Sequence, residues 1–86
     1  MLFRSIESIV KNNLSHLIDI DASRIDIDLS IFDDYSLTSL SIVILITNIC
    51  DETDVPVFNF TDADIANLRT LRDVITMFTT AAGQDA

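Results

Sequence analysis

Turn-forming residues are scarce in this sequence: among its 86 residues there is one glycine, Gly83, and one proline, Pro56. An all-β domain needs a tight turn every few residues, and glycine and proline supply most of the required backbone conformations. The scarcity of both residues therefore disfavours a fold built on a sheet. The length is sufficient for one hydrophobic core, so we expect a single helical domain.

Apolar residues near the N-terminus recur at intervals of three and four, which predicts an amphipathic helix from about residue 2 to residue 18. They are Leu2, Phe3, Ile6, Ile9, Val10, Leu14, Leu17 and Ile18. A second stripe predicts another helix that follows Ser39 and ends before Pro56, because the residue before a proline disfavours helix. This stripe consists of Ile42, Leu45, Ile46, Ile49 and Thr53.

Two further helix starts are predicted from capping patterns, in which a hydroxyl residue is followed three positions later by an acid. Thr61 with Asp64 opens a short helix, and Thr70 with Asp73 opens a last helix that fades near residue 82. The second helix therefore precedes a short third helix and a longer fourth one.

The segment from residue 19 to residue 38 is rich in Asp and Ser, which favour turns and caps. Four of its apolar residues are spaced to pin a loop to the core: Ile25, Leu29, Ile31 and Phe32. The alternation over residues 25–29 also fits a short strand, but an isolated strand has nothing to pair with, so a loop is favoured. A connection of this length without regular structure is usually functional.

Together these segments predict an all-α, small four-helix bundle. It has three main helices, a short third helix and a long loop between the first two helices. We expect the domain to occupy residues 1–82 and residues 83–86 to form a loose tail.

The charge is strongly acidic, with 14 Asp and Glu against five Lys and Arg, giving a net charge of −9. Nucleic acid and anionic membranes are disfavoured as partners because phosphate contacts need Lys and Arg, and partners with basic surfaces are favoured. The longest aliphatic run, residues 42–46, is too short to span a bilayer. Arg4, Glu7 and Lys11 interrupt the N-terminal apolar residues, so no signal peptide is expected. We expect a cytoplasmic monomer.

Catalytic side chains are few. His16 lies off the apolar stripe of the first helix, and no Asp or Ser occurs at a spacing from it that would indicate a catalytic site. We therefore expect His16 at the surface. Cys50 has no second cysteine for an intramolecular disulfide or a cysteine-based zinc site, and is interpreted as a small apolar residue beside the core. We therefore do not expect an enzyme.

One acidic segment begins like a calcium-binding loop, with Asp19, Asp21 and Ser23 at alternate positions. However, Arg24 stands where such a loop requires glycine, and Ser30 stands where it requires a closing glutamate. We therefore expect no metal site, and interpret this segment as a solvated acidic surface that faces partners.

Residues 31–40, with the sequence IFDDYSLTSL, resemble a pattern of carrier proteins in fatty acid, polyketide and nonribosomal peptide synthesis. In that family L-F-x-D leads, through a few residues that usually include glycine, to D-S-L at the head of the second helix. Residues 53–57 align without a gap to the family's aromatic-Gly-aliphatic-x-aliphatic segment, and residues 67–73 to its N-L-x-T-L/V-x-D segment. The resemblance covers the whole chain and implies an acyl-carrier-protein-like bundle.

The resemblance implies that Ser39 is the site of covalent attachment of 4′-phosphopantetheine, which derives from CoA. The chain would then hold acyl or aminoacyl intermediates as thioesters for partner enzymes. The implied partners are a phosphopantetheinyl transferase, an acyl- or aminoacyl-loading ligase, and downstream synthases or transferases. A helix N-terminus suits a phosphodiester, because its free N–H groups and the helix dipole favour negative charge. By residue type alone, Ser39 would be interpreted as an N-cap.

Three departures from the family's pattern matter: Thr38 replaces the usual Asp, Ser36 the usual Gly, and Ile44 a frequent Glu. Some stand-alone carriers also have Thr or Ser before the modified serine, so we interpret Thr38 as the mark of a subfamily. Thr38 also leaves open a noncatalytic adaptor, which would keep the bundle and bind a partner without a prosthetic group. A second register would make Ser36 the modified residue, but it needs an insertion before residues 55–56.

Leu40, Val43 and Ile44 are apolar on the side of the second helix opposite its buried stripe. With Thr38, they form a candidate partner-binding surface, since exposed apolar clusters often mark interaction sites. The other interpretation is that this helix is buried on more than one side. The sequence leaves both open.

Overall fold

Helix starts follow the capping side chains in the computed structural model, which describes residues 5–81. Ser5 Oγ accepts the Ser8 N–H at 3.1 Å. Thr61 and Asp64 form a complete capping box. Thr70 and Asp73 do the same, because each side chain accepts the other's backbone N–H. Both predicted capping patterns are therefore confirmed.

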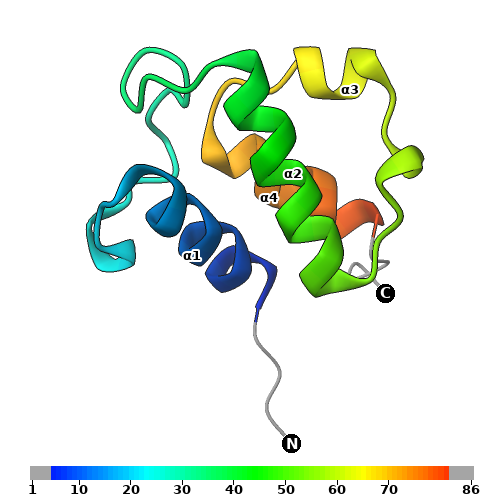
Figure 1. Cartoon of the computed structure of the whole chain (residues 1–86), viewed down its shortest axis with the longest axis horizontal. Helices are drawn as coiled ribbons and strands as arrows, with labels where there is room; N and C mark the ends of the chain where they lie inside the picture. Colours follow the sequence, from blue (N-terminus) through cyan, green and yellow to red (C-terminus); the bar gives the residue numbers. More distant parts are fainter. Residues whose placement is uncertain (1–4, 82–86) are drawn as a thin grey trace, which may run out of the picture.

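The resulting elements are four helices and two short 3₁₀ turns (Figure 1). They are α1 (Ile6–Ile18), η1 (Ala22–Arg24), α2 (Ser39–Thr53), η2 (Val57–Asn59), α3 (Asp62–Ala66) and α4 (Leu71–Ala81). Residues 5–81 contain no strand, only an isolated bridge between Ser30 and Thr70. The all-α bundle with a short third helix is confirmed. The prediction that the first helix starts at about residue 2 is wrong, because α1 begins at Ile6 and Ser5 before it is an extended N-cap. The tail predicted for residues 83–86 lies outside the described residues.

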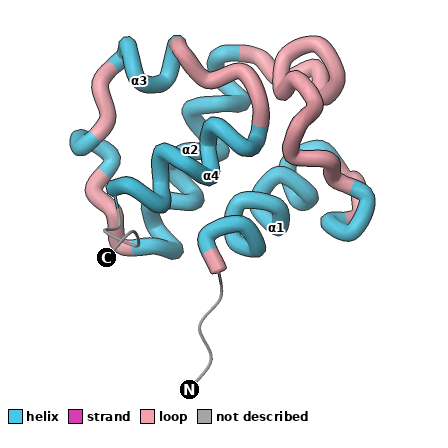
Figure 2. The backbone as a smooth tube through the Cα atoms, turned by 180° about the vertical axis from the view of Figure 1, so that it is seen from behind, coloured by secondary structure: helices cyan, strands magenta, loops and turns pink. Residues whose placement is uncertain are grey.

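The core lies where α1, α2 and α4 meet, with α4 behind α2 in Figure 1 and in front of it in Figure 2. Four members of the predicted α2 stripe are buried, and Thr53 is partly buried. The largest completely buried side chains include Leu14, Ile31, Leu71 and Phe78. Asn13 on α1 donates its side-chain amide to the Glu52 carboxylate on α2, which links these helices at the surface.

The long loop is pinned to the core by fewer residues than predicted. Ile25 and Ile31 are buried as expected, but Leu29 and Phe32 are exposed, so the prediction for these two is wrong. The cause is a tight turn that begins at Ser30, whose N–H donates to the Asp34 carboxylate at 2.8 Å. Such a turn directs Ile31 inward and leaves its neighbours outside. Residues 25–29 contain no strand, and residues 27–29 form a turn.

The same loop is fastened to the start of α4. Ile31 donates its N–H to the Arg69 carbonyl at 2.9 Å, and Arg72 donates its N–H to the Ile27 carbonyl at 2.9 Å. The Arg72 guanidinium also donates two hydrogen bonds to the Asp28 carboxylate, of 2.7 and 3.1 Å. This hydrogen bonding lowers the pKa of Asp28. Because this loop leads directly into α2, its attachment to α4 fixes where the N-terminus of α2 lies.

Candidate functional site

The residue that caps α2 is Thr38. Its backbone is extended, with φ −101° and ψ 171°, and its side-chain oxygen accepts the Ser41 N–H at 3.2 Å. The Ser41 hydroxyl lies 3.1 Å from the same oxygen. The simplest interpretation of Ser39 from residue type, as the cap of this helix, is therefore wrong. Thr38 performs the capping for which Asp is also well suited, so its side chain has a structural role here.

Ser39 is the first residue of α2, and it is exposed. Its hydroxyl makes no hydrogen bond within residues 5–81. The first turn of a helix has backbone N–H groups without intrahelical partners, and the dipole there favours negative charge. The site thus combines an accessible nucleophilic oxygen with a backbone suited to a phosphodiester.

The backbone before α2 bears on the choice between the two serine registers. Ser36 lies outside the helix with φ 58°, and Asp54 after α2 has φ 59°. Both are left-handed conformations that glycine adopts most readily. In the register that aligns Ser39 with the modified serine, these are the two positions where the carrier pattern has glycine. The backbone therefore agrees with that register, whereas the rival register would put the attachment in a loop.

A hollow of about 210 Å³ opens beside Ser39 between α2 and α3. It is mostly apolar and is lined by Phe32, Ser39, Ile42, Val43, Asp62, Ile65 and Ala66. Sequence patterns did not predict Phe32 or Ile65 at this site, because their proximity to Ser39 depends on how the loop and α3 pack over α2. An apolar part of a group attached to Ser39 would find a surface there.

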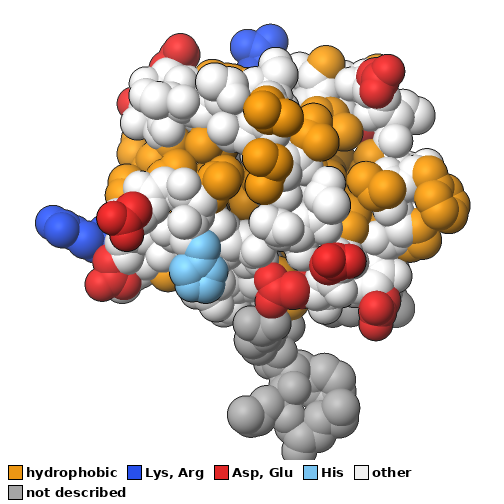
Figure 3. Space-filling view, in the orientation of Figure 1, with side chains coloured by type: hydrophobic (Ala, Val, Ile, Leu, Met, Phe, Trp, Pro, Cys, Tyr) orange, Lys and Arg blue, Asp and Glu red, His pale blue; other side chains and the backbone are white. Residues whose placement is uncertain are grey.

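The outward side of α2 is exposed. Leu40, Val43 and Ile44 have 70%, 49% and 41% of their surfaces accessible, and Thr38 is exposed too. The interpretation that α2 is buried on more than one side is therefore wrong. Apolar side chains gather over α2 in the space-filling view, with acidic side chains around them (Figure 3).

The segment that runs from the long loop through α2 to α3 carries charges of one sign. No Lys or Arg occurs between Arg24 and Arg69. The same segment holds nine acids: Asp26, Asp28, Asp33, Asp34, Asp51, Glu52, Asp54, Asp62 and Asp64. The site therefore lies in a region of negative charge, which favours partners with positive surfaces.

Other candidate residues contribute no second centre. His16 is exposed as expected. Cys50 is buried as expected, and burial, with a smaller effect of Asp51, raises the pKa of its thiol.

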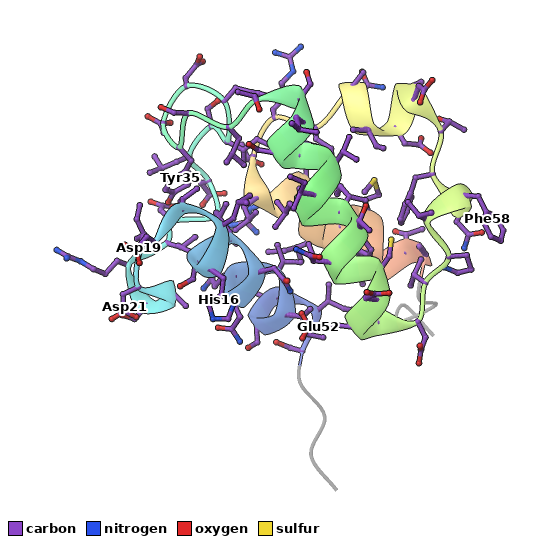
Figure 4. The ribbon with its side chains drawn as sticks, viewed as in Figure 1. His16, Asp19, Asp21, Tyr35, Glu52 and Phe58 are labelled. Carbon is purple, nitrogen blue, oxygen red and sulfur yellow. The ribbon has the colours of Figure 1, made fainter. Side chains whose placement is uncertain are left out.

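The Asp21 carboxylate accepts the Ser23 N–H and so caps η1, and Asp19 ends α1 (Figure 4). Within residues 5–81, no three His, Cys, Asp or Glu side chains are placed to hold a metal ion. In that range no helix is long and apolar enough to cross a membrane.

Comparison with known families finds a match over most of the chain. The family described as phosphopantetheine attachment site matches residues 8–78, which include the long loop, α2, the hollow and most of α4. No curated protein gives a significant match to the chain.

Proposed function

The chain belongs to the phosphopantetheine attachment-site family, and from that premise we propose that its attachment residue is Ser39. The cofactor of such a domain is 4′-phosphopantetheine, bound covalently. The observation that carries the proposal is the free, exposed hydroxyl of Ser39 at a helix N-terminus that its neighbour Thr38 already caps. Modification of Ser39 would therefore cost the helix no cap.

The chemistry asked of this chain is limited. Ser39 Oγ would form a bond to the phosphorus that carries the pantetheine arm of CoA. The P–O bond within the pyrophosphate would break, adenosine 3′,5′-bisphosphate would leave, and the transferase would accept the serine proton. The bound cofactor supplies a thiol on a long flexible arm. The chain itself presents the serine and supports the phosphodiester with the first-turn N–H groups of α2. Members of this family are typically carriers, not catalysts.

We infer that the cargo is an acyl or aminoacyl group, held as a thioester for a loading ligase and for downstream synthases or transferases. Such enzymes would dock on the exposed surface of Leu40, Val43 and Ile44 beside Ser39, with Thr38 at its edge. Ile44 lies where related carriers often have Glu, so the partner contact at that point would be apolar. Burial of such a side chain is worth about 1.5–3 kcal/mol, or roughly tenfold to more than a hundredfold in affinity.

The test is incubation of the purified chain with CoA and a phosphopantetheinyl transferase, followed by intact mass and thiol titration. We expect the mass to rise by one phosphopantetheinyl group. We also expect the folded chain to gain one thiol that reacts with Ellman's reagent, because Cys50 is buried and its thiol pKa is raised.

Variants at the three serines near the N-terminus of α2 provide the control. Ser39→Ala should abolish the mass gain, while Ser36→Ala and Ser41→Ala should retain it. A wild-type chain that folds but is never modified would support the adaptor without a prosthetic group and would contradict this proposal.

A further inference from the structure

The most exposed large apolar side chain within residues 5–81 is Phe58, with 84% of its surface accessible. It lies on η2 and points away from the bundle (Figure 4), and its neighbour Val57 is also exposed. Two residues further on, Phe60 packs edge-to-face against Phe78, with ring centroids 5.0 Å apart. Of the two phenylalanines in this segment, Phe60 therefore packs against the core, whereas Phe58 has no role in packing the fold.

Phe58 lies within reach of an enzyme bound at Ser39. Asp62 lines the same hollow as Ser39 and follows Phe58 by four residues, a span of at most about 14 Å even for an extended chain. A standard protein interface covers about 800 Å² on each partner, which corresponds to a patch about 30 Å across. A single footprint of that width that covers Ser39 near one edge can therefore also include the Phe58 ring.

The charges around the Phe58 ring indicate which kind of protein can bind there. Asp51, Glu52 and Asp54 precede η2, Asp62 and Asp64 follow it, and residues 25–68 contain no Lys or Arg. A second copy of this chain, with a net charge of −9, would meet this surface with repulsion. A protein with an apolar pocket rimmed by Lys and Arg would complement both the ring and its surroundings.

We propose that Phe58 is an anchor that inserts into such a pocket on the phosphopantetheinyl transferase, an inference that rests on the proposed function of Ser39. The transferase must bind CoA, whose phosphates require a basic enzyme surface. It also meets the chain before any arm exists, so its affinity comes from the protein surface alone. Phe58 is then a specificity-determining contact for modification, separate from the apolar side chains of α2.

The experiment measures steady-state kinetics of a purified transferase with CoA on wild type, Phe58→Ala, Phe58→Leu and Ile20→Ala. Ile20 is also an exposed apolar residue, but it follows α1, on the opposite side of the molecule from η2 (Figure 1). We expect Phe58→Ala to raise the KM for the carrier about tenfold, the effect of removing a moderate aromatic anchor, with kcat unchanged. Phe58→Leu should recover part of this loss, and Ile20→Ala should behave as wild type. Melting curves followed by circular dichroism should show Phe58→Ala to be as stable as wild type.

Three results would overturn the inference. An unchanged KM in a normally modified Phe58→Ala chain would overturn it alone and leave Ser39 as the attachment site. A wild-type dimer in sedimentation that Phe58→Ala dissociates would assign the ring to contact between copies. A wild-type chain that is never modified would overturn the proposed function and this inference together.

Discussion

Within residues 5–81, three residues that are not glycine have a left-handed backbone, and the two that flank α2 should each weaken the fold. Ser36 and Asp54 have φ values of 58° and 59°. A residue with a Cβ destabilises the folded chain by roughly 1–2 kcal/mol in this conformation. Glycine avoids that cost, but its greater freedom in the unfolded chain lowers the stability of the fold by about 0.5–1 kcal/mol. The net gain expected from Ser36→Gly is therefore about 0.5–1 kcal/mol. For a domain of this size that corresponds to a rise of about 2–8 °C in Tm.

Asp54→Gly should stabilise the chain by more than Ser36→Gly does. Asp54 is the C-cap of α2, where a carboxylate faces the negative end of the helix dipole. Asp54→Asn separates the two causes, because it removes the charge but keeps a side chain that tolerates left-handed backbone. The two glycine substitutions lie at opposite ends of α2, about 22 Å apart for a 15-residue helix, so their effects should add.

The assay is urea unfolding followed by circular dichroism, with Ser36→Ala as the matched control for loss of the hydroxyl. Ser36→Ala should be neutral or destabilising, because alanine keeps the Cβ. If Ser36→Gly and Asp54→Gly both leave the free energy of unfolding unchanged, the backbone argument and the alignment that depends on it are refuted.

The capping role of Thr38 predicts that Thr38→Ala lowers the free energy of unfolding by about 1 kcal/mol, and Thr38→Ser by much less, both measured in urea. Ile44 is 41% exposed, so Ile44→Glu should leave Tm nearly unchanged while weakening a partner that offers an apolar pocket; a large fall in Tm would show the residue to be core. The raised pKa of Cys50 means that the folded chain retains its thiol proton to higher pH than the unfolded chain does. Stability should therefore fall as pH rises above about 8.5, the pKa of an unperturbed thiol, and Cys50→Ala should remove that part of the slope.

Local signals predicted most of the helical architecture. The caps at Thr61 and Thr70 depend on residues three positions apart, and the buried stripe of α2 depends on a strict helical period. Both kinds of signal are contained in a few consecutive residues. Ser39 was also placed correctly at the head of α2, although the cap itself is its neighbour Thr38. Two adjacent hydroxyl residues compete for that role, and the sequence does not show which of them keeps an extended backbone.

Features that depend on tertiary contacts were not predictable. Phe32 is exposed and Ile31 buried because the turn that holds them is bonded to Arg69, almost forty residues away. Phe58 and Phe60 are alike in type and lie two positions apart on a segment without helical or strand period. Only the packing of Phe60 on Phe78 distinguishes them. The hollow beside Ser39 likewise requires α3, which contributes Asp62 and Ile65.

The assignment of Ser39 is tested most directly by locating the modification within the chain. Trypsin is of little use, because no Lys or Arg occurs between Arg24 and Arg69. Cleavage before Asp releases residues 34–50, a peptide that contains Ser36, Ser39 and Ser41. Fragmentation of this peptide from the chain treated with CoA and transferase should place the phosphopantetheinyl group on Ser39. Its detection on Ser36 or Ser41, or on a peptide elsewhere in the chain, would contradict the account.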